Sequence, residues 1–140
     1  MAKQDDPNVQ DDELLYRLVH PSFAQRNQQN LKIIEITSQT FKTKSLSSLR
    51  LKYLDFNTAR QADPARNRVA KPHYGVAVFS AGFVRQALGC IICVENEQEF
   101  PPDSHVVIYR DASGQPLTAS QCKSLATAAH LAISPQGVPP

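Results

Sequence analysis

The residues best suited to chemistry lie at the end of the first apolar segment, where Arg17, His20 and Ser22 follow one another closely. A histidine so close to a serine can act as a general base toward the hydroxyl. The chain has no G-x-S-x-G sequence, so the turn that presents the serine of many hydrolases is not expected. The alternative is structural, because histidine and serine beside a proline commonly make local turn hydrogen bonds.

Two hydroxyl side chains, Thr37 and Ser38, form a second candidate. In ADP-ribosyltransferase-type sites, small hydroxyls on a strand support the nicotinamide ribose, between an early arginine or histidine and a late glutamate. The chain has Arg17, the hydroxyl pair and the glutamates of 97–99 in that order. His105 begins a later β-prone run and can transfer protons near neutral pH. The resulting hypothesis is a small enzyme of nucleotide or NAD chemistry that uses Arg17, His20, Ser38 and His105.

Three cysteines, Cys90, Cys93 and Cys122, raise the question of redox or metal chemistry. Cys90 and Cys93 form a C-x-x-C that follows an expected helix end at Gly89 and enters a strand, whereas redox pairs use a helix N-terminus. Residues three apart on a strand face opposite sides of the sheet. The sequence has no second C-x-x-C and no H-x-x-x-H. We therefore expect inert cysteines, no metal site and no cofactor.

Composition narrows the class of protein. The 140 residues are 41% hydrophobic, which suits one domain with one core. The net charge of +2 creates no strong field, so nucleic-acid binding through the basic residues of 50–71 is a weak alternative. No apolar run approaches the roughly 20 residues of a membrane-spanning helix. The polar start of the chain is unlike a secretory signal, and the odd number of cysteines is unlike a disulfide framework, so a cytoplasmic protein is expected.

The elements that must position these residues are organised around residues 74–110, the longest stretch of the chain that is rich in strand-forming apolar residues. Apolar periodicity and turn residues there predict a strand over 74–79, a helix over 81–88, and strands over 91–94 and 105–109.

The rest of the chain supplies weaker elements. Residues 1–12 are expected to be a disordered leader and 135–140 a flexible tail. Residues 13–20 favour a short strand, because the following proline disfavours a helix. Further expected elements are a β-prone run over 31–42, a half-exposed strand over 49–55, a helical turn capped by Asn57, and a helix from a capping box of Thr118 and Gln121 to Ser134. The prediction is a single α+β domain over 13–134 with about five strands and two or three helices, the C-terminal helix packed on the sheet.

Four segments carry a resemblance. The chain reads L-Y-R-L-V-H-P-S-F at 15–23, T-S-Q-T-F-K at 37–42, G-V-A-V at 75–78 before A-L-G at 87–89, and H-V-V-I at 105–108. These segments resemble a family of small uncharacterised bacterial proteins with an L-Y-R-x-[IV]-H-P-S-[FW] opening, an S-S-Q-A-F segment and an E-H-V-V-I strand. The resemblance implies a bacterial cytosolic protein made alongside a partner. The chain departs from the pattern at 25–34 and 46–71.

The sequence contains no complete catalytic or cofactor constellation. The leading hypothesis is therefore an interaction or accessory protein, adaptor-like or immunity-like, whose sheet edge or C-terminal helix binds a protein partner. The enzyme and the weak nucleic-acid binder are the alternatives. The enzyme hypothesis requires its four side chains to converge on one pocket.

Overall fold

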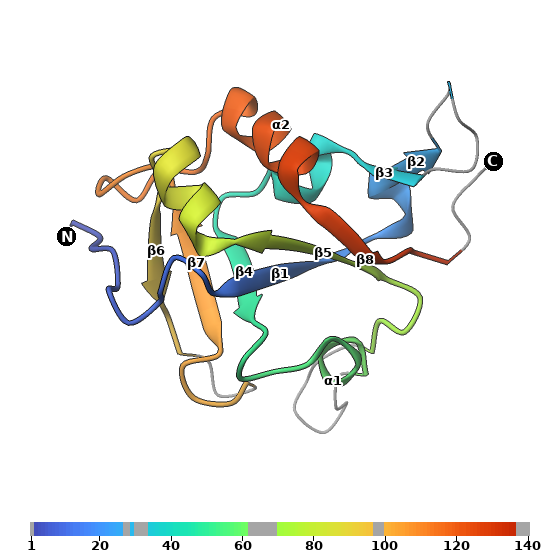
Figure 1. The fold of residues 1–140 in the computed structure, drawn as a ribbon, viewed down its shortest axis with the longest axis horizontal. Helices are drawn as coiled ribbons and strands as arrows, with labels where there is room; N and C mark the ends of the chain where they lie inside the picture. The colour runs from blue at the N-terminus through green and yellow to red at the C-terminus, as the bar shows by residue number, and fades with distance from the viewer. Residues whose placement is uncertain (1, 27–28, 30–33, 62–69, 97–99, 137–140) are drawn as a thin grey trace.

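The central strands of the main sheet are β1 (Leu14–Val19) and β5 (Gly75–Ser80), whose apolar side chains reach both faces of the sheet. The computed structural model describes residues 2–26, 29, 34–61, 70–96 and 100–136. The main sheet has six strands in the order β6-β7-β4-β1-β5-β8, and every neighbouring pair is antiparallel. Strands β2 (Ala24–Arg26) and β3 (Ile34–Ile36) form a separate two-stranded sheet (Figure 1).

The remaining elements are short. The other strands of the main sheet are β4 (Leu46–Arg50), β6 (Ile91–Val94), β7 (His105–Tyr109) and β8 (His130–Ile133). The helical segments are η1 (Pro21–Phe23), η2 (Ser38–Phe41), α1 (Phe56–Arg60), the π-type turn η4 (Phe83–Ala87) and α2 (Ala119–Ala128). The chain is therefore the single α+β domain that the sequence predicts, with more strands than expected.

Helices cover both faces of the sheet. Helix α2 and turn η4 lie on one face and α1 on the other (Figure 1). On the α2 side, Leu125 of α2 and Val84 of η4 join strand residues such as Phe79 in the larger apolar cluster. On the α1 side, Ala59 packs in a smaller cluster with Tyr16. Tyr16 also donates hydrogen bonds to the carbonyl oxygens of Leu54 and Asp55, at 2.7 and 3.1 Å, and so fixes the entry to α1.

Several predicted elements are confirmed. The strands predicted over 91–94 and 105–109 match β6 and β7, and the strand over 74–79 matches β5 to within one residue. Gly89 ends the predicted helix in the left-handed region, at φ 68°. Thr118 and Gln121 form the expected capping box, with reciprocal bonds of 3.1 and 2.8 Å.

The C-terminal helix is shorter than predicted. Helix α2 ends at Ala128, and Ala129 turns the backbone to an extended conformation. The chain then forms β8, which pairs with β5 through Ile133 and Leu131. The alanine-rich spacing favoured a helix to Ser134, but the free edge of β5 offers a full set of backbone partners that the isolated helical pattern does not reveal.

Two expected strands are replaced in part by turns. The run predicted over 31–42 leaves the strand conformation at Thr37, whose hydroxyl and backbone N–H both donate to Phe23 O at 2.8 Å, and continues as η2. The strand expected over 49–55 ends at Arg50, whose carbonyl accepts N–H groups from Tyr53 and Leu54. Asp55, and not Asn57, caps α1 by accepting the Thr58 N–H at 2.8 Å.

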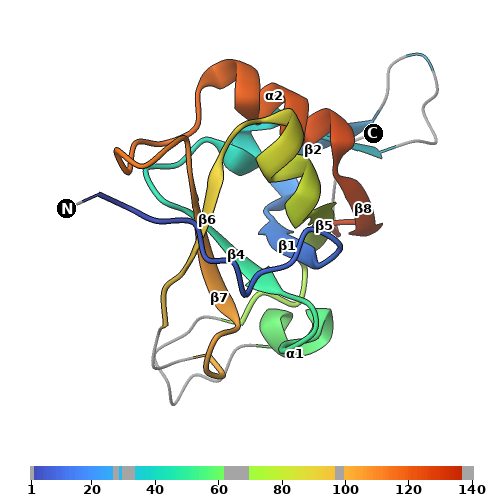
Figure 2. The same ribbon diagram turned by 60° about the vertical axis from the view of Figure 1, so that its left-hand side comes forward.

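The first residues of the chain differ from the expected disordered leader. Residues 4–6 lie beside β6 (Figure 2), where the Asp6 N–H donates to Ile92 O at 2.8 Å, and the chain then reaches η4, where Asp11 O accepts the Gly82 N–H at 2.9 Å. Arg85 of η4 holds this segment through carboxylates of Asp5 and Asp11, at 3.0 and 2.9 Å. Val9 is fully buried in the larger apolar cluster. Two of the four aspartates in this segment, Asp5 and Asp11, are thus partners of a single arginine.

A buried ion pair joins the start of β1 to the end of β4. The Nε and Nη2 atoms of Arg50 donate to the two carboxylate oxygens of Glu13, at 2.5 and 2.9 Å. The side chains are 2% and 5% exposed. Carbonyl oxygens of Asp103 and Asn8 accept two further Arg50 N–H groups, so four of the five N–H groups of the cation have acceptors.

We predict that Glu13→Ala lowers the free energy of unfolding by about 3 to 5 kcal/mol, because it leaves Arg50 as a buried charge without its counter-ion. Urea denaturation followed by circular dichroism measures the change. Lys3→Ala is the control, because it removes an exposed ion pair to Glu95 and is expected to change the stability far less than Glu13→Ala. Equal stability of Glu13→Ala and the unmodified protein would contradict the structural role of this pair.

Candidate functional site

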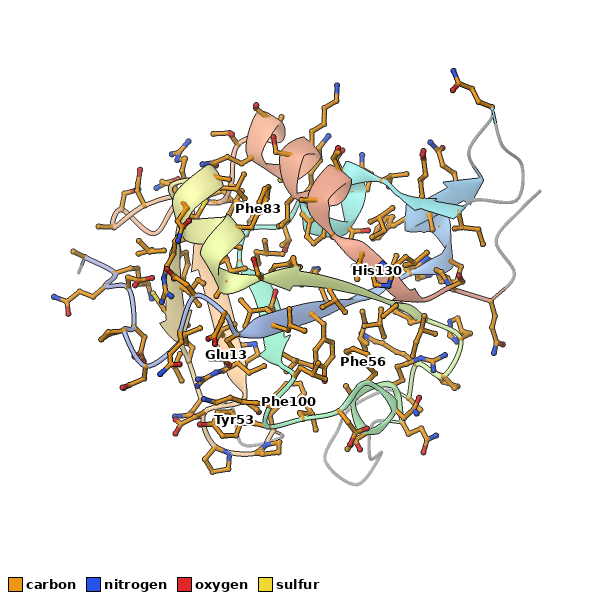
Figure 3. All side chains as sticks on the ribbon, viewed as in Figure 1. Glu13, Tyr53, Phe56, Phe83, Phe100 and His130 are labelled. Carbon is orange, nitrogen blue, oxygen red and sulfur yellow. The ribbon has the colours of Figure 1, made fainter. Side chains whose placement is uncertain are left out.

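A pocket of about 270 Å³ opens beside the centre of the main sheet. Its lining comes from β1, η2, β4, β7 and the segments that precede β5 and β7. The lining residues are Tyr16, Arg17, Leu18, His20, Thr40, Ser47, Ser48, Leu49, Lys71, Tyr74, Phe100 and His105. Phe100 lies on the α1 side of the sheet, as does Phe56 (Figure 3).

The pocket forms where β1 separates from β4. These strands pair at Leu15 with Arg50 and at Tyr16 with Leu49, and the pairing does not continue beyond Tyr16. Arg17 occupies the opening. Its Nη1 donates to Ser47 O at 2.6 Å and its Nε donates to Thr40 O at 2.7 Å. The Arg17 guanidinium therefore donates to a β4 carbonyl oxygen that would otherwise accept an N–H from the neighbouring strand.

Arg17 has an unusual electrostatic environment. The side chain is half-buried, and desolvation lowers the pKa of its guanidinium. Both of its hydrogen-bond acceptors are neutral carbonyls, and no carboxylate of the described residues pairs with it. Arg50 and Arg85, by contrast, each have carboxylate partners. A guanidinium has five N–H donors, so Arg17 retains donors for a further acceptor.

Two buried hydroxyls line the same pocket. Thr40 and Ser48 are each 2% exposed. Thr40 Oγ1 and Ser48 Oγ have no hydrogen-bond partner within the part of the chain that the structure describes. A buried hydroxyl left without a partner costs about 1 to 3 kcal/mol, so an acceptor that reaches either oxygen would stabilise the protein.

The two histidines of the pocket are oriented by their own backbone surroundings. His20 Nδ1 accepts the Ser22 N–H at 3.0 Å and lies 2.7 Å from Ser22 Oγ. The local turn hydrogen bonds that were the structural alternative for His20 and Ser22 are thus present. His105 Nδ1 lies 2.6 Å from Glu95 O, so this nitrogen carries the proton. The His105 ring stacks on Phe100, with centroids 5.6 Å apart.

Aromatic rings and a lysine form the more exposed wall. The Tyr74 ring meets the His20 ring edge-on, with centroids 5.1 Å apart. Lys71 Nζ lies 5.1 Å from the centre of the Tyr74 ring. His20 is exposed, whereas Lys71, Tyr74 and Phe100 are half-buried. Thr40, Ser48 and His105 are thus among the buried residues of the lining, whereas Arg17 is half-buried like Lys71 and the Tyr74 and Phe100 rings.

The structure brings together three of the four predicted site residues. Arg17, His20 and His105 line the pocket, and Ser38 is not among its lining residues. The glutamates of 97–99, which the enzyme hypothesis also uses, lie outside the described residues. Sequence reasoning missed Thr40, Ser47, Ser48, Lys71 and Tyr74. The serines of L-S-S-L at 46–49, set inside an apolar strand, were the available signal for two of them.

The basic segment of 50–71 does not form one exposed surface in the described residues. Arg50 is buried against Glu13. Arg60 donates to the carbonyls of Tyr74 and Pro72 and to Asn57 Oδ1. Lys52 lies over the Tyr53 ring. The arginines at 66 and 68 lie outside the described residues.

Comparison of the chain with models of protein families, with curated proteins and with solved structures gives no match. The resemblance to a bacterial family therefore stays a prediction from the sequence. Within the described ranges, no helix is long and apolar enough to cross a membrane. No group of three or more histidine, cysteine or acidic side chains in those ranges could hold a metal ion.

The three cysteines are free and buried. Cys90 belongs to the larger apolar cluster on the α2 side, whereas Cys93 packs with Val107 and Tyr109. The members of the C-x-x-C therefore face different surroundings, as the strand geometry predicted. Burial raises the pKa of each thiol, that of Cys90 to about 11.

We predict that the folded protein reacts slowly with Ellman's reagent at pH 8. A thiol of pKa about 11 is ionised in about one molecule in a thousand at that pH, and burial also blocks the reagent. Reactivity should increase as the pH rises toward 11, because the thiolate is the nucleophile. The control in guanidinium chloride should release three equivalents. A rapid native reaction at pH 7 would show an accessible, activated cysteine instead.

Proposed function

We propose that the protein binds a small organic anion, a phosphate ester or a carboxylate, in the pocket beside Arg17. The observation that carries this proposal is the desolvated Arg17 guanidinium, which is held by two neutral carbonyls and has no carboxylate partner among the described residues. A desolvated cation is stabilised by an opposite charge in good hydrogen-bonding geometry.

The other side chains of the pocket also favour a negatively charged ligand. Lys71, His20 and His105 are basic, and the described lining contains no aspartate or glutamate. The partnerless hydroxyls of Thr40 and Ser48 can each donate to an oxyanion. Three elements, β1, η2 and β4, thus direct donors to one place, which is an arrangement typical of a preformed anion site.

The volume limits the size of the ligand. Pockets for drug-sized ligands range from about 300 to 1,000 Å³. The 270 Å³ found here lies just below that range, which favours a small metabolite over a whole dinucleotide such as NAD. Arg17, His20 and His105 of the enzyme hypothesis line the proposed binding pocket, so a role in nucleotide chemistry is compatible with this proposal. The small volume gives less support to NAD as the ligand.

The cellular setting is part of the proposal. Free, buried cysteines are typical of a reducing compartment, which supports the bacterial cytoplasm that the sequence resemblance implies. The adaptor or immunity-like role expected from the sequence stays a prediction. Strand β8 has one neighbour in the described sheet, and its outer edge is where a partner strand would add.

Isothermal titration with ribose 5-phosphate, inorganic phosphate and malonate, at constant ionic strength, tests the binding of anions. We expect at least one to bind, and Arg17→Gln to weaken that binding about tenfold or more, because a charge-assisted bond to a desolvated guanidinium is lost. Arg110→Gln is the matched control, because Arg110 is exposed beside Asp111 and lies outside the pocket lining.

Ser48→Ala covers the case in which Arg17→Gln does not fold. It removes a hydroxyl without a partner in the described protein, so the folded state should keep its stability. Anion affinity should fall several-fold. Absence of binding to all three anions, or equal affinity in Arg17→Gln and Arg110→Gln, would refute the proposed function.

A further inference from the structure

We infer that the ligand of this pocket is a nucleoside monophosphate, with its phosphate at Arg17 and its base against the aromatic wall. The inference rests on the proposed anion site and adds the identity of the ligand. It follows from how polarity and exposure change along the pocket.

The polar groups around Arg17 suit a phosphate better than a carboxylate. Arg17, Thr40 and Ser48 come from β1, η2 and β4, so their donors approach from separate elements. A tetrahedral phosphate directs three oxygens outward, whereas a carboxylate directs two in one plane. The phosphate monoester also carries up to two negative charges, which suits a pocket that holds a second cationic side chain, Lys71, beside Tyr74.

The half-exposed wall suits a base. The Tyr74 ring makes T-shaped contacts with the rings of His20 and His73, with centroids 5.1 and 4.9 Å apart. Phe100 and His105 stack nearly parallel, at 5° between planes. Fixed aromatic rings near a cationic site are what proteins use to stack nucleobases, and stacking tolerates any base because each has a π-face.

The size of the pocket agrees with one nucleotide. At about 270 Å³ it lies just below the range of about 300 to 1,000 Å³ for drug-sized ligands. The ribose of the nucleotide would span from the phosphate site at Arg17 to the base at Tyr74 and Phe100. All three residues line one pocket. A dinucleotide would have to extend out of the pocket.

The test compares AMP, UMP, ribose 5-phosphate and adenosine by isothermal titration with the full chain. We expect AMP or UMP to bind about tenfold or more tightly than ribose 5-phosphate, because stacking adds to the phosphate contact. Adenosine should bind more weakly than AMP. If ribose 5-phosphate binds and neither nucleotide binds more tightly, the inference is overturned while the anion site stands. If no phosphate binds, the proposed function itself fails.

Two variants separate the contribution of the Tyr74 ring to nucleotide affinity from that of the phosphate contacts. Tyr74→Leu should reduce nucleotide affinity to that of ribose 5-phosphate and leave the affinity for ribose 5-phosphate unchanged. Tyr53→Leu is the control, because Tyr53 is 45% exposed and lies outside the pocket lining. His73→Ala provides a second test, since it removes an edge contact of Tyr74 without touching the pocket lining. Unchanged nucleotide affinity in both Tyr74→Leu and His73→Ala would overturn the assignment of the base to this wall.

Discussion

The separation of β1 from β4, with Arg17 in the opening, is the constraint on which the candidate site depends. Two antiparallel strands in the middle of a sheet normally continue their ladder, because each buried carbonyl needs a donor. Here the ladder stops after Tyr16, and the Arg17 side chain donates to Ser47 O in place of a strand N–H. The same side chain donates to Thr40 O and so ties η2 to the sheet. One arginine thus replaces backbone pairing and leaves space beside itself.

An arginine lies at each end of the β1–β4 pair, and the two arginines differ in the charge of their hydrogen-bond acceptors. At one end Arg50 binds both carboxylate oxygens of Glu13, and its charge is neutralised inside the protein. Arg85 is likewise paired, with Asp5 and Asp11. Arg17, at the other end, has neutral acceptors among the described residues. The fold therefore neutralises Arg50 and Arg85 with carboxylates, whereas Arg17 and Arg60 donate to neutral acceptors, and Arg17 is the one of these two that lines the pocket. This contrast within one chain is the strongest reason to assign the pocket to an anion.

Local sequence patterns were sufficient for some elements and not for others. The apolar runs of β6 and β7, the left-handed Gly89 and the capping box of Thr118 depend on neighbouring residues, and each was predicted. Strand β8 depends on the edge of β5, and the turn at Thr37 depends on Phe23, so neither can be found from local periodicity. The acidic start of the chain suggested disorder, because its partner Arg85 lies far along the sequence. Three of the four predicted site residues share the pocket because β1, which carries Arg17 and is followed by His20, and β7, which begins at His105, lie on either side of β4. Ser48 had a sequence signal in its place within L-S-S-L, but Thr40 had none, since a hydroxyl without a partner is visible only in the folded protein.

A crystal structure with bound selenate, with diffraction data collected at the selenium absorption edge, tests the central claim most directly. The selenium signal locates a tetrahedral oxyanion without assumptions about its shape. We predict an anomalous peak whose oxygens lie about 2.7 to 3.2 Å from the Arg17 guanidinium and from a hydroxyl of Thr40 or Ser48. Selenate bound at exposed lysines with none beside Arg17, and a carboxylate of the chain seated on that guanidinium, would contradict the account.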